Sequence, residues 1–463
     1  MFETSVYIQR REKLRRAVSK GILIFPGNVE LPMNYPGNVL PFRQDSTFLY
    51  YFGIDRPGLN AVIDLENGTE IVFGDDITID DVVWMGPQPS LAELAEKVGV
   101  REVRSSEAFM EYIRNALSRK QEVHFLPQYQ DGTKIQLAAA LNISPEDINQ
   151  HISESFTRAV IAQRSIKQDE EIEEMEKALA ITYEAHLAAM QHTRPGRSEH
   201  FVAGKVTGEV FKYGVLLSFP IIFTVRGEIL HNAPTARVMQ EGQLALCDMG
   251  AESHRHYAGD ITRTFPVNGT FTDVQKDVYN IVLRAQLTAI EAIKPGVKYR
   301  DVHLKAAKVI AEGLKDIGVM KGDVDAAVKA GAHALFFPHG LGHMIGLDVH
   351  DMEGLGEDRV GYDEEVRRSD QFGLAYLRMA KRLEPGHVVT VEPGIYFIPP
   401  LIDQWRAEGK HTDFIDYNRL EAFRDFGGIR IEDNVLVTPD GARVLGEPIA
   451  KTVDAIEEVM RGT

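Results

Sequence analysis

The chain has 463 residues, of which 44% are hydrophobic and 26% are charged, as is usual for a globular protein. At roughly 150 residues per domain, this length predicts two or three domains. The formal net charge of −17 argues against nucleic acid as a partner, because phosphate backbones bind to basic surfaces. No apolar stretch approaches the roughly 18 residues that span a bilayer, and the opening MFETSVYIQRREKLRRAV is too polar for a secretory signal. We therefore expect a cytoplasmic protein with no membrane partner.

Residues 1–160 alternate strand-like and helix-like signals, which predict a smaller N-terminal α/β domain. Gly21–Phe25 (GILIF) and Thr47–Phe52 (TFLYYF) are expected strands. Residues 61–73 predict a β-hairpin that turns at Asn67 and Gly68, since Asn-Gly is a strong turn signal. No dense cluster of possible metal ligands occurs here, so we expect this domain to shape or cover a site.

Residues 161–463 contain a weak internal repeat. The stretch SIKQDEEIEEMEKALAITYEAHLAAM has apolar residues at spacings of three and four, which predicts a long amphipathic helix that ends at Arg194-Pro195-Gly196. A second helix is expected to end in KPG at Lys294–Gly296, and each is followed by a further helical segment. The pattern predicts two related α/β halves.

The repeat continues in the strands. Gly242 and Gly386 each open an expected strand that carries an acid six residues later, Asp248 in one half and Glu392 in the other. In each half a second strand carries another acid, Asp260 or Glu432. We therefore expect a pair of metal ions at a pseudo-two-fold axis.

Asp248 and Asp260 are separated by the turn-like segment AESHRHYAG. Two antiparallel strands joined by this loop would bring both carboxylates to one edge of a sheet. His254 and His256 lie in the loop and are expected to face solvent. Cys247, the single cysteine, alternates with Asp248 and is expected to point into the core on the opposite face.

Five residues form the candidate metal site: Asp248, Asp260, His343, Glu392 and Glu432. Most of them lie within or beside apolar, β-branched runs, where an unpaired charge would be costly. Four carboxylates and one imidazole form an oxygen-rich ligand set that can hold two divalent cations.

Further histidines accompany this set. His339, His343 and His350 lie within the glycine-rich segment HGLGHMIGLDVHD, and His231 occupies a similar position in the other half. Those that do not bind metal can donate hydrogen bonds to an oxyanion or grip a substrate. Arg430, two residues before Glu432, is expected to partner the charge of that glutamate.

The sequence segments that contain these residues together resemble those of the metallopeptidases of the pita-bread fold, in the aminopeptidase P and prolidase branch. PFRQDSTFLYYFGIDRPG resembles part of the N-terminal domain of that branch, and the chain from Arg164 onward resembles its catalytic domain. The resemblance implies an aminopeptidase P-like domain at 1–160 and a pita-bread α/β (α+β) catalytic domain at 161–463. It also implies ligand roles: one metal on Asp248, the other on His343 and Glu392, with Asp260 and Glu432 bridging the two.

The resemblance further implies hydrolysis of the bond between an N-terminal residue and a following proline. Manganese is the expected metal, with cobalt or zinc as substitutes. His231, His339 and His350 match the substrate and transition-state histidines of the family, and Glu392 would relay a proton to the leaving proline nitrogen. A homodimer or larger homo-oligomer is expected from the family.

Two specificities remain open within this branch. The opening YIQRREKLRRAV is more similar to Xaa-Pro aminopeptidases. Arg378, in GLAYLRMAKRLEPG, stands where prolidases carry an arginine for the substrate carboxylate, which favours an Xaa-Pro dipeptidase. The neighbouring basic residues also fit a solvated basic face. Arg378 and Arg430 are the candidate substrate-binding residues.

Three other readings use the same fold: a creatinase-like hydrolase without metals, a methionine aminopeptidase, and a binding protein that has lost catalysis. The complete five-residue ligand set argues against the first and the last, and the large N-terminal domain argues against the second.

Overall fold

The computed structural model describes residues 1–462, which form two compact units. The first unit comprises Met1–Arg164 with the short segment Glu353–Gly356. The second comprises Ser165–Met352 and the chain from Glu357 onward. Within the described residues, no helix combines the length and the hydropathy that crossing a bilayer requires.

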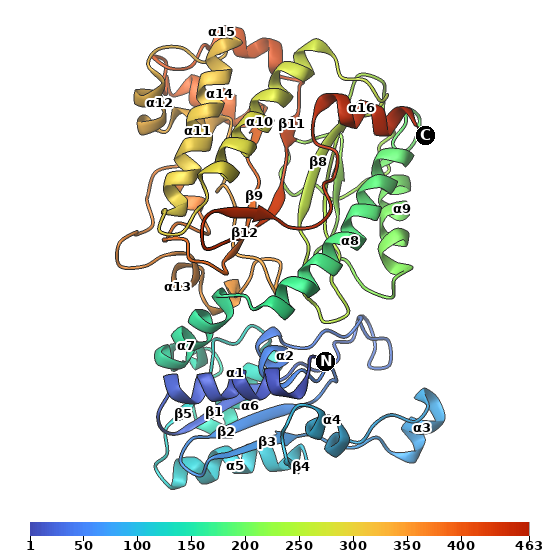
Figure 1. Cartoon of the computed structure of the whole chain (residues 1–463), viewed down its shortest axis with the longest axis vertical. Coiled ribbons are helices and arrows are strands. Elements are labelled where there is room, and N and C mark those ends of the chain that lie inside the picture. Colours follow the sequence, from blue (N-terminus) through green and yellow to red (C-terminus); the bar gives the residue numbers. More distant parts are fainter. Residues whose placement is uncertain (463) are drawn as a thin grey trace. The chain divides into compact units, whose positions relative to one another are not determined.

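The first unit is built around a five-stranded mixed sheet in the order β4-β3-β2-β1-β5 (Figure 1). The expected hairpin is confirmed, because β2 and β3 are antiparallel neighbours and Gly68 lies in their turn with a φ of 70°. The expected first strand is confirmed as β1, which pairs antiparallel with β2 and parallel with β5. The strands are β1 (Ile22–Pro26), β2 (Asn60–Asp64), β3 (Thr69–Phe73), β4 (Glu102–Arg104) and β5 (Val123–His124).

The strand expected at Thr47–Phe52 is wrong, because these residues lie in helix α2 (Ser46–Phe52). Asp45 caps the helix by accepting a hydrogen bond from the Phe48 N–H at 2.9 Å, and Gly53 ends it with a φ of 63°. Every residue of α2 is buried, so the aromatic run carries no periodicity that separates a strand from a helix. The other helices of this unit are α1 (Thr4–Ala17), α3 (Ile79–Met85), α4 (Leu91–Lys97), α5 (Glu107–Ser118), α6 (Asp131–Leu141) and α7 (Glu154–Ser165).

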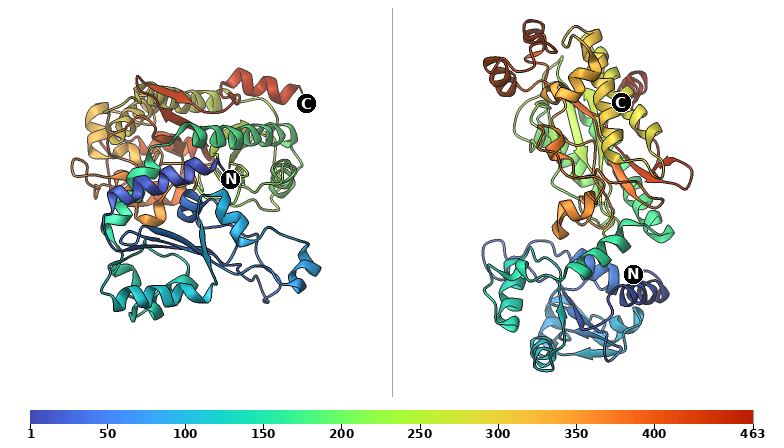
Figure 2. Two further views of the ribbon diagram at one scale, coloured as in Figure 1. Left: turned by 60° about the horizontal axis from the view of Figure 1, so that its bottom comes forward. Right: turned by 90° about the vertical axis from the view of Figure 1, so that its left-hand side faces the viewer.

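The second unit carries two pairs of long helices beside its sheets (Figures 1 and 2). The pair α8 and α9 contacts strands β6, β7 and β8, and α10 of the second pair contacts β9, β10 and β11. The expected amphipathic helix is α8, which begins at Asp169 after a capping box between Gln168 and Glu171. The helices are α8 (Asp169–His192), α9 (Glu199–Phe211), α10 (Asp273–Ala292), α11 (Tyr299–Asp316), α12 (Val324–Ala330), α13 (Glu357–Gly361), α14 (Pro399–Ala407), α15 (Tyr417–Leu420) and α16 (Val453–Arg461).

Three small sheets lie between these helices, in the orders β6-β7-β8, β13-β12-β9 and β10-β11. All of their strand pairs are antiparallel. The strands are β6 (Ile222–Thr224), β7 (Leu244–Met249), β8 (Ile261–Pro266), β9 (Val388–Val391), β10 (Gly394–Tyr396), β11 (Gly428–Arg430), β12 (Asp433–Val437) and β13 (Ala442–Val444).

Matching hydrogen bonds confirm the repeat. The Gly196 N–H donates to the Met239 carbonyl at 2.9 Å, and the Gly296 N–H donates to the Leu383 carbonyl at 2.8 Å. Each helix pair is therefore tied, at the turn between its helices, to the segment that leads into β7 or β9. Because Asp248 lies near the end of β7 and Glu392 directly follows β9, the two halves place their acids in similar ways.

Backbones approach each other closely beside Asp260. A Cβ atom on Gly250, directly after β7, would lie 1.7 Å from the carbonyl oxygen of Gly259. Glycine at position 250 therefore allows the segments that carry Asp248 and Asp260 to pass each other.

We expect Gly250→Ala to lower the melting temperature, with a destabilisation of about 1–3 kcal/mol or more, since a backbone atom cannot rotate away from the new methyl group. Gly204→Ala is the matched control, because position 204 lies in α9 with no atom within 4 Å of a new Cβ. That change should stabilise the helix by about 0.5–1 kcal/mol. Equal melting temperatures for the two variants would contradict the close-approach argument.

Candidate metal centre and active site

The first two acids come from neighbouring strands. Asp248 lies in β7 opposite Thr262 of β8, and Asp260 directly precedes β8. Side chains alternate along a strand, so Asp260 and Thr262 share a face and Asp248 stands beside them. Asp248 and Asp260 are both buried, at 7% and 5% exposure. The expected antiparallel placement of these two carboxylates is confirmed. The thiol of Cys247 is buried in the core, as expected.

His343 is fixed against β9 by its main chain. Its N–H donates to Thr390 Oγ1 at 3.1 Å, and the Thr390 N–H donates to the His343 carbonyl at 3.0 Å. Nδ1 lies 3.0 Å from the Met344 carbonyl, so this nitrogen carries the proton and Nε2 keeps its lone pair. Nε2 lies 3.3 Å from Asp260 Oδ2 and 3.7 Å from Glu392 Oε1. The imidazole thus presents a ligand atom to the carboxylates.

Glu432 lies between β11 and β12 and is held from the first half of the repeat. Its N–H donates to the Thr262 carbonyl at 3.0 Å, and Thr262 Oγ1 donates to Glu432 Oε2 at 2.6 Å. On the other side of the chain, Arg263 Nη1 donates to the Glu432 carbonyl at 2.7 Å. Arg263 is itself buried in an ion pair with Asp433, at 2.8 Å. These bonds fix the Glu432 backbone on both sides.

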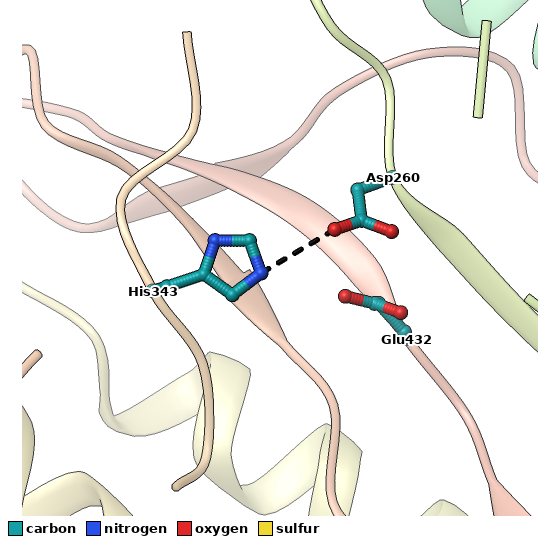
Figure 3. A group of neighbouring side chains, drawn as sticks. All are labelled: Asp260, His343 and Glu432. Atoms are coloured by element: carbon teal, nitrogen blue, oxygen red, sulfur yellow. Dashed lines mark ion pairs between the residues drawn. The ribbon is translucent and has the colours of Figure 1, made fainter. Parts of the chain in front are cut away.

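The side chains of Asp260, His343 and Glu432 point toward one another (Figure 3). One ligand atom from each lies within 4.8 Å of the others, which is compatible with a shared cation. Oδ1 of Asp248 is buried, and no described residue donates a hydrogen bond to it. A buried carboxylate oxygen of this kind calls for a cationic partner. The donor set therefore fits divalent metal ions.

Crowding raises the proton affinity of these acids. Burial and the charge of Asp248 raise the pKa of Asp260 well above its ordinary value. Burial and the charge of Asp260 likewise raise the pKa of Glu432. Burial raises the pKa of Glu392 to about 8, against the opposing effect of Arg430. Four carboxylates line this cavity with two arginines, so bound cations would remove an excess of negative charge.

The structure corrects the expected partner of Arg430. Its Nη2 donates to Asp248 Oδ2 at 2.7 Å, so its direct ion pair is with Asp248 rather than with Glu432. Nη1 donates to the Tyr396 hydroxyl at 2.9 Å, and Nε donates to Thr262 Oγ1 at 3.1 Å. Strand alternation places Arg430 on the same face as Glu432, but Asp248 of β7, a strand of another sheet that contacts β11, supplies the closer carboxylate.

Tyr396 and Thr262 were missed by the sequence reasoning. The Tyr396 hydroxyl lies 2.9 Å from His339 Nε2 and accepts the bond from Arg430, so it links these two side chains. Thr262 could have been found, because its alternation with Asp260 in GDITRTF places both on one face. Tyr396 has no comparable signal, since VEPGIYF gives no indication of which partner its hydroxyl reaches.

The five candidate ligands and Arg430 line one cavity of about 410 Å³. His231 has an exposed side chain, His339 and His350 are partly buried, and Arg378 joins them in lining the cavity. The His350 ring packs on His343 with centroids 4.2 Å apart. The remaining lining residues are mostly apolar: Phe219, Pro220, Ile221, Ile222, Leu230, Ala233, Gly340, Gly342, Val349 and Tyr376.

Two further expectations concern residues near the site. His254 is exposed, as expected, and does not line the cavity. His256 is only partly buried, and its Nδ1 lies 2.6 Å from Glu252. Neither histidine joins the candidate metal group.

Comparison with protein families identifies the class. Residues 173–439 match the model of Metallopeptidase family M24, and residues 7–124 match that of the Aminopeptidase P N-terminal domain. The chain therefore belongs to metallopeptidase family M24. Both matches confirm the expected pita-bread catalytic fold preceded by an aminopeptidase P-like domain.

Individual relatives span nearly the whole chain. The Xaa-Pro dipeptidase of Homo sapiens is 35% identical over 97% of this chain and 91% of its own length. The probable Xaa-Pro aminopeptidase PEPP of Fusarium vanettenii is 34% identical over 98% of this chain and 93% of its own. A solved structure of an Escherichia coli aminopeptidase P variant with substrate superposes with a TM-score of 0.81 and 28% identity, over 100% of this chain and 99% of that one.

The raised pKa values predict how metal binding depends on pH. Free of metal, the folded chain keeps protons on Glu392 between its ordinary pKa of 4.5 and about 8, whereas the unfolded chain has lost them. Stability of the metal-free protein therefore falls with rising pH over this window, and cations that bind the ionised carboxylates offset the loss. We expect the increase in melting temperature on adding manganese to grow from about pH 6 to about pH 8.

Thermal melts with manganese and with a chelator measure this increase at each pH. Titration of histidines far from the site affects both melting temperatures equally and cancels in their difference. Glu432→Gln should reduce the increase at every pH. Glu365→Gln is the control, because the side chain of Glu365 is 52% exposed and does not line the cavity. An increase that is constant across the pH range would contradict the electrostatic argument.

Proposed function

We propose that this chain hydrolyses the peptide bond between an N-terminal residue and a following proline, as a metal-dependent exopeptidase. The observation that carries the proposal is the group Asp260, His343 and Glu432, which meets inside the cavity of a family M24 chain. The names of the relatives, Xaa-Pro dipeptidase and Xaa-Pro aminopeptidase, support the choice of substrate.

The proposed ligands are Asp248, Asp260, His343, Glu392 and Glu432, with Asp260 and Glu432 shared between two ions. Manganese fits best, because carboxylate oxygens dominate the set and suit hard cations. A zinc-substituted form of the Escherichia coli aminopeptidase P has been solved with product, which makes zinc an alternative. When bound, two such ions make a water molecule available as a nucleophile near neutral pH and polarise the scissile carbonyl.

Glu392 is the proposed proton carrier. Its carboxylate lines the cavity and lies close to two histidines, where it can accept and pass on a proton. Oε1 lies 3.7 Å from His343 Nε2, and Oε2 lies 3.9 Å from His339 Nδ1, so the carboxylate reaches toward the open cavity. We assign to Glu392 the transfer of a proton to the departing proline nitrogen.

The histidines are the proposed substrate contacts. His350 lines the cavity beside His343 and is placed to donate a hydrogen bond to the oxyanion that forms at the scissile carbonyl. His339 is neutral, because burial and the nearby charge of Arg430 lower its pKa to about 3. His231 lies at the exposed edge of the cavity and is assigned to bind the peptide.

Selectivity for proline follows from the cavity wall. Phe219, Ile221, Leu230 and Val349 provide apolar surface, which suits the methylene groups of the proline ring. The Xaa-Pro bond also lacks an N–H, so no acceptor is needed for that group in the cavity.

A second candidate, Xaa-Pro dipeptidase, is favoured by Arg378. This residue lines the same cavity and lies 3.8 Å from Glu357, with 37% of its side chain exposed. A dipeptide places its free carboxylate directly after proline, and a guanidinium at that point would bind it. The Xaa-Pro aminopeptidase activity instead requires space for a continuing chain.

Replacing either shared ligand should abolish hydrolysis. We expect Asp260→Ala and Glu432→Ala to lower kcat by at least about 10³-fold, because each removes a carboxylate from both ions. Metal content, measured by mass spectrometry of the dialysed protein, should fall in parallel. Glu447→Ala is the control, since this acid is exposed and does not line the cavity. Unchanged turnover in either variant would contradict the proposal that Asp260 and Glu432 are shared between the two ions.

Arg378 separates the two specificities. If it binds a proline carboxylate, Arg378→Ala should raise KM for Ala-Pro by about 10-fold or more and leave Ala-Pro-Ala nearly unchanged. Arg382→Ala is the control, because Arg382 belongs to the same basic stretch but pairs with Glu365 outside the cavity. A wild-type preference for Ala-Pro-Ala, with no selective loss in the variant, would exclude the dipeptidase reading.

A further inference from the structure

A buried ion pair lies behind the cavity and takes no part in the functions assigned so far. Lys167 Nζ lies 2.7 Å from Asp351 Oδ2, and each side chain is only 1% exposed. Neither residue lines the cavity. Because withdrawing two charges from water is costly, a pair this deeply buried contributes little net stability. Its position therefore points to a different role.

Asp351 closes the loop that follows the candidate ligand His343. Its N–H donates to the Met344 carbonyl at 2.8 Å, which joins the two ends of the segment 344–351. Inside this loop the Gly346 N–H donates to the Asp348 carbonyl at 3.1 Å. The Gly346 carbonyl in turn accepts from the Ala258 N–H at 2.8 Å, which ties the loop to the segment before Asp260.

The loop is shaped around the ion pair. A Cβ atom on Gly346 would lie 2.6 Å from Asp351 Oδ2 and 2.8 Å from Lys167 Cε. The glycine therefore lets the backbone pass directly over the bonded charges. The backbone at Gly346 therefore packs directly against both charged groups, and a shift of either group toward the loop would displace that backbone.

Lys167 is itself held at its main chain. Its N–H donates to the Gly386 carbonyl at 2.9 Å, and the Gly386 N–H donates to the Val437 carbonyl at 2.9 Å. Gly386 lies in the turn that opens β9, the strand that leads to Glu392. Lys167 thus connects Asp351, at the end of the loop 344–351, to the sheet that contains β9 and β12.

His350 is the residue next to Asp351. Its ring packs on His343 at 4.2 Å between centroids, with the planes inclined by 57°. The direction in which this ring faces depends on the backbone at residues 350 and 351. The buried ion pair of Asp351 with Lys167 holds that backbone in place.

We infer that Lys167 is a positioning residue for the reaction, which acts through Asp351 to hold His350 in place beside His343. The inference rests on the proposed peptidase function, in which His350 stabilises the oxyanion. Lys167 contacts no substrate in this role. It fixes the donor in the geometry that the transition state requires.

A double-mutant cycle between Lys167 and His350 tests this role. In the manganese-loaded wild type, Lys167→Met should lower kcat for Ala-Pro-Ala or Ala-Pro by about 10- to 100-fold, with metal content unchanged. In a His350→Ala background the same change should cost less than about 2-fold, because the group it positions is already gone. Equal losses in the two backgrounds would overturn the inference and leave a purely structural role.

Two further variants keep the test decisive. If Lys167→Met fails to fold because Asp351 has lost the charge of Lys167, the neutral pair Lys167→Met/Asp351→Asn replaces it in both backgrounds. Lys167→Arg, which retains the charge, should recover most of kcat. Arg15→Met is the matched control: it removes the partly buried Arg15–Glu70 pair of the first unit and should lower stability without lowering kcat.

A crystal structure of the manganese-loaded Lys167→Met protein provides a readout that does not need turnover. We expect the His350 ring to leave its position 4.2 Å from His343. A ring that stays in place would overturn the inference. A wild type that hydrolyses no Xaa-Pro peptide would instead refute the proposed function, and the ring position would still test the role of Lys167.

Discussion

Four carboxyl groups converge on one cavity, and the rest of the catalytic unit is arranged around the free-energy cost of that convergence. Ionised acids repel one another strongly in a medium of low polarity, so a bare site keeps protons on some of them. The raised pKa values of Asp260, Glu392 and Glu432 express this cost. Arg430 offsets part of it through Asp248. The remaining charge is what two divalent cations would neutralise, so affinity for metal and the instability of the empty site have a common origin.

The internal repeat explains how one chain assembles such an unfavourable cluster. Each half ties its helix turn to the segment before a strand, through the bonds of Gly196 and Gly296. The two halves are then joined at the site itself, where Thr262 of one half bonds both the backbone and the carboxylate of Glu432 in the other. The packing of both halves of the repeat therefore contributes the free energy that holds these like charges together. Two paired strands alone, without this packing, would not hold four carboxylates together against their mutual repulsion.

Much of this arrangement could be predicted because it follows local rules. The spacing of Asp248 and Asp260 around a turn implies antiparallel strands, and alternation along β8 places Thr262 beside Asp260. The interactions that could not be predicted join elements far apart in the chain. Arg430 pairs with Asp248, 182 positions away, because the register between sheets is set by tertiary packing rather than by sequence spacing. The sequence predicts a strand at Thr47–Phe52, where the structure has helix α2, for a related reason: burial on every side removes the periodicity that distinguishes a strand from a helix.

Side chains next to the ligands and histidines hold them by hydrogen bonds and an ion pair. Tyr396 fixes His339, Thr390 fixes the backbone of His343, and Lys167 reaches Asp351 beneath the loop of His350. Each contact costs its own desolvation, and replacing both partners of a buried ion pair such as Lys167–Asp351 by apolar side chains would leave the net stability of the fold similar or higher. Retaining polar groups there is reasonable only if the orientation of the histidines matters more than net stability. Preorganised donors lower a barrier because they need no rearrangement when charge develops on the carbonyl oxygen.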